Sequence, residues 1–247
     1  MTGFSQNLLE GKSILITGAG RGLGRACVES VVKCAAQVIA VARTATDLQS
    51  LVDEFGSNVE PWVEDVTSDQ FLKRLGALEK LDGLVNNAGT NRVGRMAEQT
   101  VDDLDAVINL NIRSLWLVSQ AALPAMTRSN NASIVHMSSQ MGHVGSPNRT
   151  LYCMSKHAVE GLTKAMAVEL AEDGIRVNSI APTFVLTTMT GPMMEEQEFS
   201  DFVMNMIPQK KLAGLDEVSA ACTFLLSDLS ASTTGSCLKV DGGWTAH

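Results

Sequence analysis

Residues 12–24 read KSILITGAGRGLG, an apolar run that ends in a glycine-rich turn. A helical pattern follows over residues 26–32. This order of strand, turn and helix is the phosphate-binding half of a dinucleotide fold. The glycines allow the backbone to approach a pyrophosphate, and the helix N-terminus supplies N–H donors and a positive dipole. The turn predicts phosphate contacts from Gly18, Arg21, Gly22, Leu23 and Gly24.

The end of the second predicted strand indicates which dinucleotide binds. Residues 38–42 read VIAVA, and Arg43 and Thr44 follow. An acidic residue at this place takes the 2′-hydroxyl of NAD, whereas an arginine accommodates the 2′-phosphate of NADP. Arg21, within the glycine turn, adds a second cation on the same side. The sequence therefore favours NADP(H) over NAD(H) as the cofactor.

Two further predicted strands end in polar residues. Residues 59–63 lead to Asp65 and Val66, where we expect the carboxylate to meet the adenine amino group. Residues 81–85 lead to the run NNAG. Asparagines after a strand often only shape a turn, but in an open α/β sheet ligands bind at the carboxyl ends of strands. We therefore expect the cofactor to rest on Asn87, Ala88 and Gly89.

A tyrosine and a lysine stand four residues apart at the start of a helical run. Tyr152 and Lys156 should share one helix face. A free tyrosine has a pKa of about 10, and a fixed cation beside it lowers that pKa toward neutrality. Ser139 follows the apolar strand 132–137 and lies 13 residues before the tyrosine. The sequence predicts that these three side chains meet and carry out proton transfer.

Asn111 lies inside a long helical pattern over residues 101–126, among apolar neighbours. Asparagine is a poor helix residue. A buried asparagine needs partners, so we expect a kink or an ordered water at this position.

The remaining patterns alternate helix and strand, which is typical of a single α/β domain over residues 1–247. Helices are expected over 47–55, 71–78 and 215–226, and strands over 175–181 and 237–240. The methionine-rich segment at about 187–208 is either filler packing or an adaptable substrate lid.

Composition excludes several classes of protein. The chain has 247 residues, 45% of them hydrophobic, without an apolar run of the roughly 20 residues that span a bilayer. Residues 1–10 do not resemble a signal peptide. Five cysteines without metal-site spacing indicate reduced thiols in a cytoplasmic protein, and no metal. A net charge of −8 argues against nucleic-acid binding. We expect neither nucleic acid nor membrane as a partner.

These motifs, in this order and spacing, resemble the short-chain dehydrogenase/reductase family over essentially the whole chain. The matching positions are Thr17-Gly18-x-x-x-Gly22-x-Gly24, Asn86-Asn87-Ala88-Gly89, Asn111, Ser139, Tyr152-x-x-x-Lys156, and Pro182 with Val185 and Thr187. The resemblance implies a Rossmann-type, doubly wound, seven-stranded parallel sheet and a homotetramer. It also implies a catalytic tetrad of Asn111, Ser139, Tyr152 and Lys156, and cofactor contacts from Pro182, Val185 and Thr187.

One departure from the family pattern is Thr183, where many members carry glycine after the proline. Reductases of sugars and small carbonyls share this threonine. Together with Ser138-Ser139-Gln140 and the end at Trp244, it most resembles xylulose reductases and gluconate 5-dehydrogenase-like enzymes.

The sequence therefore predicts an NADP(H)-dependent oxidoreductase of alcohols and ketones. Ser139 would hold the substrate oxygen, Tyr152 would transfer its proton, and Lys156 would bind the nicotinamide ribose. Gln140, His143 and Arg149 would contact a small polar substrate, a keto sugar or a sugar acid, although the methionine-rich segment favours an apolar ketone.

Two alternatives remain open. A 3-oxoacyl carrier-protein reductase would need a basic patch, for which the candidates are Arg92, Arg95, Arg113 and Arg128. A catalytically inactive nucleotide-sensing regulator is the alternative from another class, but the tetrad here is complete.

Overall fold

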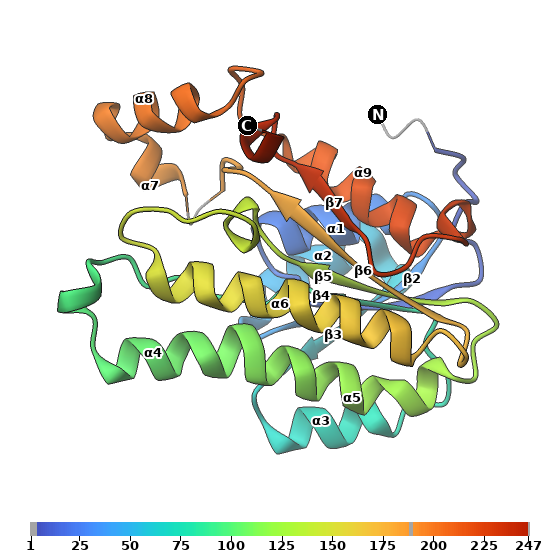
Figure 1. The fold of residues 1–247 in the computed structure, drawn as a ribbon. Helices are drawn as coiled ribbons and strands as arrows, with labels where there is room; N and C mark the ends of the chain where they lie inside the picture. The colour runs from blue at the N-terminus through green and yellow to red at the C-terminus, as the bar shows by residue number, and fades with distance from the viewer. Residues whose placement is uncertain (1–3, 188–189, 247) are drawn as a thin grey trace.

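The computed structural model describes residues 4–187 and 190–246, and its centre is a seven-stranded sheet in the order β3-β2-β1-β4-β5-β6-β7 (Figure 1). All neighbouring strands are parallel. The strands are β1 (Ser13–Thr17), β2 (Gln37–Ala42), β3 (Val59–Val63), β4 (Gly83–Asn86), β5 (Ala132–Met137), β6 (Ile175–Pro182) and β7 (Cys237–Val240). The predicted Rossmann-type fold is confirmed.

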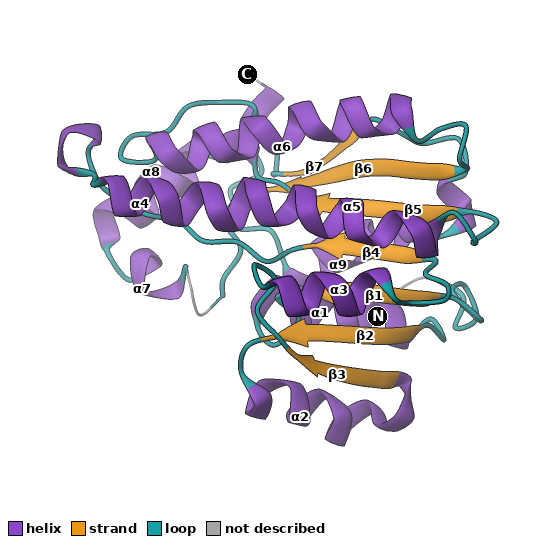
Figure 2. Ribbon diagram, turned by 90° about the horizontal axis from the view of Figure 1, so that it is seen from below, coloured by secondary structure: helices purple, strands orange, loops and turns teal. Residues whose placement is uncertain are grey.

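Helices cover both faces of the sheet, which explains why the central strands are apolar on both sides. Every residue of β5 and β6 is buried. One face carries α1 (Gly22–Val32), α2 (Ala45–Phe55) and α9 (Leu215–Leu226), and the other carries α3 (Asp69–Gly76), α4 (Val101–Val107), α5 (Ser114–Met126) and α6 (Thr150–Glu169). Figure 2 shows the second group lying across the sheet.

The chain order reverses beside β1, which pairs with β2 on one side and β4 on the other. A reversal of this kind leaves a crevice at the carboxyl ends of the strands, because the connecting helices depart to opposite faces. Most of the predicted site residues follow the carboxyl ends of β1 to β6, so they gather at this edge.

The long helix predicted over 101–126 is interrupted. A π-helical segment, Ile108–Arg113, separates α4 from α5. π-helical turns appear mostly as short insertions in α-helices, often at functional sites. Asn111 lies within this segment and is buried, so the irregularity expected at this asparagine is present as a change of helix type.

Two short helices follow β6, α7 (Gly191–Met194) and α8 (Gln197–Met206). Buried side chains from α8 and the C-terminus form a separate apolar cluster, which includes Phe184, Val203, Ile207 and Trp244. The segment predicted as a lid corresponds to these helices, except that residues 188 and 189, including Met189, lie outside the described residues.

Candidate active site

A cavity of about 490 Å³ lies along the carboxyl ends of the central strands. Its lining includes these predicted residues: Gly18, Arg21, Gly22, Leu23, Arg43, Thr44, Asp65, Val66, Asn87, Ala88, Gly89, Ser139, Tyr152, Lys156, Pro182, Val185 and Thr187. One continuous pocket therefore joins the glycine turn after β1 to the start of α6.

The turn after β1 is closed by glycines that no other residue can replace without movement. Gly18 has φ +64°, a conformation that favours glycine. A Cβ on Gly18 would lie 2.9 Å from Asn87 Nδ2, and one on Gly24 would collide with the Gly18 carbonyl oxygen. Gly24 therefore acts in close packing of the turn, whereas Gly18 and Gly22 line the cavity.

Asn87 ties the turn after β4 to the turn after β1. Its Nδ2 donates to the carbonyl oxygens of Thr17 and Gly18 at 3.0 and 3.2 Å. Thr17 Oγ1 accepts from the backbone N–H groups of Asn87 and Ala88 at 3.0 and 3.1 Å. Two loops that are 70 residues apart are thus held together. The side-chain amide nitrogen of Asn87 is used in this contact between the loops.

Two arginines lie at the β2 end of the cavity, and they differ in how tightly each is paired with a carboxylate. Arg21 is held by Asp47, with Nε–Oδ2 and Nη2–Oδ1 distances of 2.6 and 3.1 Å. The Arg43 side chain is 78% exposed, and its Nη1 lies 3.9 Å from Asp65 Oδ2. Arg43 is therefore the cation less constrained by its carboxylate partner.

Asp65 is itself part of a local turn. Its Oδ1 accepts from the backbone N–H and the hydroxyl of Thr67 at 2.9 and 2.7 Å. The backbone hydrogen bond from Thr67 is the main cause that lowers the pKa of Asp65, and Arg43 contributes to the same direction. The carboxylate is thus ionised at the cavity wall.

Tyr152 and Lys156 line the opposite end of the cavity, where α6 begins. Lys156 Nζ donates to the Met137 carbonyl oxygen at 2.7 Å and lies 5.5 Å from the centroid of the Tyr152 ring. Ser139 Oγ donates to Gln140 Oε1 at 2.7 Å and accepts from the Met141 N–H at 3.2 Å. The predicted serine, tyrosine and lysine do meet in one place.

The protonation states at this end differ from the sequence expectation. Burial raises the pKa of Tyr152 to about 12, although a hydrogen bond with Ser139 acts in the lowering direction. Burial lowers the pKa of Lys156 to about 8, and Glu160 opposes that shift. In the protein alone, desolvation outweighs the Ser139 hydrogen bond and the charge of Arg149, so the expected lowering of the tyrosine pKa is not present.

Asn111 does not line the main cavity but supports it. Its Oδ1 accepts from the Thr90 N–H at 2.8 Å, and its Nδ2 donates to the Thr90 carbonyl oxygen at 2.9 Å. Nδ2 also donates to Ser155 Oγ at 3.0 Å, next to Lys156 in the sequence. Thr90 lines the cavity. Asn111 therefore connects the loop after β4 to the first turns of α6.

The three residues predicted to contact the substrate are placed differently. Gln140 is buried and orients the Ser139 hydroxyl. His143 Nε2 contacts Cys237 Sγ at 3.2 Å and Glu160 Oε1 at 3.5 Å. The Arg149 guanidinium is buried with its carbon 6.0 Å from the Phe199 ring centroid. Among the described residues that line the main cavity, none of these three appears.

The walls formed by the ends of β5 and β6 include two residues that the sequence analysis did not assign to the site. Thr183 lines the cavity beside Pro182, and Ser138 lines it beside Ser139. Within the described part of the chain, Ser138 Oγ and Thr183 Oγ1 are buried without a protein partner. Such atoms are rare in folded proteins and call for a ligand or water. Ser138 could have been predicted from the sequence, because it directly follows the buried strand β5.

The lining fits a nicotinamide dinucleotide on structural grounds. Glycine backbone at Gly18 and Gly22 borders one part of the cavity, where a bulkier residue would be strained. The two unpartnered hydroxyls border another part. Gly18, Gly22, Arg43 and Asp65 would hold the adenosine and phosphate groups, and Lys156 and Thr183 would hold the nicotinamide half.

This geometry is that of a nicotinamide-dependent oxidoreductase, and comparison with known proteins gives the family. A family model described as enoyl-(acyl carrier protein) reductase matches residues 18–245. Human L-xylulose reductase is 39% identical over 240 residues, which cover 96% of this chain and 98% of that protein. The 3-oxoacyl-[acyl-carrier-protein] reductase of Thermotoga maritima is 38% identical over 245 residues, covering 95% and 98%.

A solved structure of a putative NAD(P)-dependent gluconate 5-dehydrogenase from Beutenbergia cavernae, with bound NADP at low occupancy, superposes with a TM-score of 0.93. It is 32% identical, and the match covers 98% of this chain and 100% of that one. The chain belongs to the short-chain dehydrogenase/reductase family, whose members act on CH–OH and C=O groups.

Proposed function

We propose that the protein is an NADP(H)-dependent oxidoreductase that transfers a hydride to or from a small polar substrate, a keto sugar or a sugar acid. The observation that carries the cofactor assignment is Arg43, an exposed arginine at the β2 end of the cavity. An arginine at this position accommodates the 2′-phosphate of NADP. The NADP bound to the Beutenbergia relative supports the same choice.

The residues at the α6 end have separate roles in this proposal. When bound, the nicotinamide supplies or accepts the hydride. Ser139 positions the substrate oxygen, and Tyr152 donates or accepts its proton over hydrogen-bond distance. Lys156 holds the nicotinamide ribose. The hydrogen bond with Ser139 and the charge of Arg149 are the protein groups that lower the pKa of Tyr152 against the effect of burial.

The substrate class rests on the relatives and on polar groups near the cavity. Similar proteins are named L-xylulose reductase and D-erythrulose reductase. Arg149 is buried close enough to Tyr152 for the two to interact electrostatically. Its guanidinium would reach a hydroxyl or carboxylate of the substrate if α8 moves, so we also propose that residues 187–208 act as a lid.

A panel of substrates tests this proposal. The ratio kcat/KM should be highest for L-xylulose or 5-ketogluconate with NADPH, lower with NADH, and lowest for an apolar diketone. A preference for NADH, or for a 3-oxoacyl thioester, would overturn it. An absence of turnover with every carbonyl, despite tight NADPH binding, would favour the nucleotide-sensing regulator instead.

The 3-oxoacyl carrier-protein reductase remains the second candidate because of the Thermotoga relative. The candidate arginines for the basic patch it requires lie in different places, and Arg92 Nη1 donates to the hydroxyl of Thr90, which lines the cavity. Arg92 lies 3.4 Å from Asp103, and Arg128 donates to the carbonyl oxygens of Leu78 and Glu79, just before β4 begins. Arg128 is therefore at the opposite edge of the sheet from the active site.

We also propose a homotetramer that uses the faces of α5 and α6. A second cavity there is lined by residues such as Trp116 and Leu162, and the Trp116 side chain is 46% exposed. An apolar surface of this kind is favoured at interfaces between subunits. Light scattering at micromolar concentration should give four times the 26.3 kDa chain mass. A monomer mass would refute the tetramer.

We also propose that the protein is located in the cytoplasm, because its cysteines are expected to be reduced thiols. Among the helices of the described residues, none combines the length and the apolar character that crossing a bilayer requires.

A further inference from the structure

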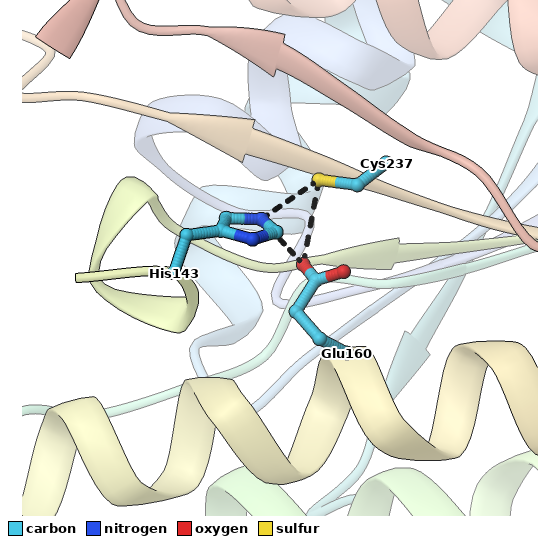
Figure 3. A group of neighbouring side chains, drawn as sticks. All are labelled: His143, Glu160 and Cys237. Atoms are coloured by element: carbon cyan, nitrogen blue, oxygen red, sulfur yellow. Dashed lines mark hydrogen bonds and ion pairs between the residues drawn. The ribbon is translucent and has the colours of Figure 1, made fainter. Parts of the chain in front are cut away.

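Three side chains from distant parts of the sequence point at one another outside the main cavity. Figure 3 shows His143 from the loop after β5, Glu160 from α6 and Cys237 from β7. His143 Nε2 lies 3.2 Å from Cys237 Sγ, and Glu160 Oε1 lies 3.5 Å from both of these atoms. The three ligand-type atoms therefore form a nearly equilateral triangle.

The size of this triangle matches one face of a tetrahedral zinc site. Zinc binds cysteine sulfur at about 2.3 Å and histidine nitrogen or carboxylate oxygen at about 2.0–2.2 Å. In a tetrahedron these bond lengths place a nitrogen and an oxygen ligand about 3.3–3.6 Å apart, and either of them about 3.5–3.7 Å from the sulfur. The His143–Glu160 and Cys237–Glu160 separations of 3.5 Å match these values, and the His143–Cys237 separation of 3.2 Å would lengthen by about 0.3 Å on binding.

The surroundings also suit a metal. Ser179 Oγ donates to both carboxylate oxygens of Glu160 at 3.1 and 2.9 Å, which fixes the orientation of the carboxylate. Hydrogen bonds from residues outside the coordination shell typically orient metal ligands in this way. The Glu160 side chain is only 7% exposed, whereas that of His143 is 23% exposed and leaves a path from solvent. A thiolate and a carboxylate would together neutralise a divalent cation.

A catalytic cysteine is the competing explanation, and the geometry disfavours it. In a nucleophile–base–acid arrangement the base uses one nitrogen for the nucleophile and the other for the acid. Here Cys237 and Glu160 both face His143 Nε2. Burial also raises the pKa of Cys237 to about 12, the reverse of what an activated nucleophile needs.

We propose that His143, Glu160 and Cys237 bind one zinc ion, with the fourth position open to water. Sulfur, imidazole and carboxylate together suit zinc better than magnesium or calcium, which prefer oxygen ligands alone. The ion links the turn that begins at Ser139 to α6 and to the edge strand β7. It therefore acts as a structural clamp on the loop that positions the catalytic serine.

Sequence spacing did not reveal this site, because the three ligands are separated by 17 and 77 residues along the chain. Only the parallel sheet brings β7 beside β6, where Cys237 pairs in register with Ser179. The Glu160 carboxylate accepts a hydrogen bond from the Ser179 hydroxyl, and Cys237 therefore lies close to the same carboxylate.

Cobalt substitution tests the ligands directly. The untagged full chain is stripped with a chelator and titrated with Co²⁺, which gives thiolate charge-transfer absorption when bound by cysteine. We expect one Co²⁺ per chain with this absorption, its loss in Cys237→Ser, and its retention in the matched control Cys153→Ser. No thiolate band in the wild type, or a band that survives Cys237→Ser, would overturn the proposal.

Zinc affinity and stability give independent readouts. Competition with a chromophoric chelator should show a more than about 100-fold weaker Zn²⁺ affinity in Glu160→Gln and His143→Gln. His157→Gln, an exposed histidine on the same helix, should bind as the wild type does. At 100 times the dissociation constant, Zn²⁺ should raise the wild-type Tm by roughly 5–10 °C. Equal Tm shifts in wild type and Cys237→Ser would show nonspecific binding and refute the site.

Discussion

Lys156 Nζ donates a 2.7 Å hydrogen bond to the carbonyl oxygen of Met137, the last residue of β5. This bond anchors the start of α6 to the sheet edge that also carries Ser138 and Ser139. The lysine thus joins the helix that supplies the tyrosine to the strand that supplies the serine. Its charge is held in a buried place, where binding of a ribose hydroxyl would add a further partner.

Replacement of Tyr152 by phenylalanine should abolish turnover. The change removes the hydroxyl that exchanges the proton and keeps the bulk of the partly buried ring. We expect kcat to fall by at least about 100-fold, as for loss of a general acid. NADPH binding, followed by cofactor fluorescence, should change little. More than a few per cent of wild-type activity would contradict the role of this residue.

Arg43→Asp should reverse the coenzyme preference. A carboxylate repels the 2′-phosphate of NADPH and accepts the 2′-hydroxyl of NADH. We expect KM for NADPH to rise roughly 10- to 30-fold, the value of one lost charged hydrogen bond. Lys33→Asp, the same charge change at the C-terminal end of α1, is the control and should leave the ratio unaltered. A wild-type enzyme that already prefers NADH would exclude the assignment.

The sequence predicted most of the sheet because its central strands are short apolar runs that end in polar residues. Strands 59–63, 132–137 and 237–240 have the observed bounds. The site residues that follow strand ends were found for the same reason, since parallel strands carry their carboxyl ends to one edge. The order and spacing of the motifs then gave the family.

Features that depend on side-chain contacts were not predictable in this way. The π-helical turn around Asn111 follows from its bonds to Thr90 and Ser155, which are distant in sequence. Tyr152 was expected to have a lowered pKa because of Lys156, but the extent of burial decides the sign of the shift. His143 was expected beside the substrate, whereas its partners come from α6 and β7.

Asn111→Ala should destabilise the protein and slow turnover. The change removes three hydrogen bonds and leaves the part-buried Thr90 backbone without its side-chain partner. A cost of about 2–3 kcal/mol in the free energy of unfolding is expected from unsatisfied buried groups. Urea denaturation measures it. Asn109→Ala, an exposed position in the same π-helical segment, should change stability by less than about 0.5 kcal/mol. Equal effects of the two changes would contradict the role of Asn111 in connecting the loop after β4 to α6.

Arg149→Ala should distinguish a polar substrate from an apolar one. If α8 moves and the guanidinium contacts a carboxylate or hydroxyl, KM for a sugar acid should rise at least about tenfold. KM for an apolar diketone should change much less. Similar changes for both substrates, together with a lowered Tm, would show that Arg149 has a structural role instead of a substrate contact.

His136 should make the protein less stable in acid. It is fully buried on β5, and its Nδ1 lies 2.9 Å from Thr163 Oγ1. Burial, with a smaller contribution from the charge of Lys156, lowers the pKa of His136 to about 3. In the unfolded chain its pKa is about 6.5. Between these values the unfolded state binds a proton that the native state does not, so stability falls as the pH falls.

The expected loss from this one residue is about 1.4 kcal/mol for each pH unit below about 6.5. Urea denaturation at pH 7.0, 6.0 and 5.0 measures the slope, to which other groups also contribute. His136→Leu should reduce the slope by nearly one proton, because leucine does not titrate. Thr163 Oγ1 retains its bond to the Val159 carbonyl oxygen in this variant. A wild-type slope that survives His136→Leu intact would show that this histidine is protonated in the native state as readily as in the unfolded one.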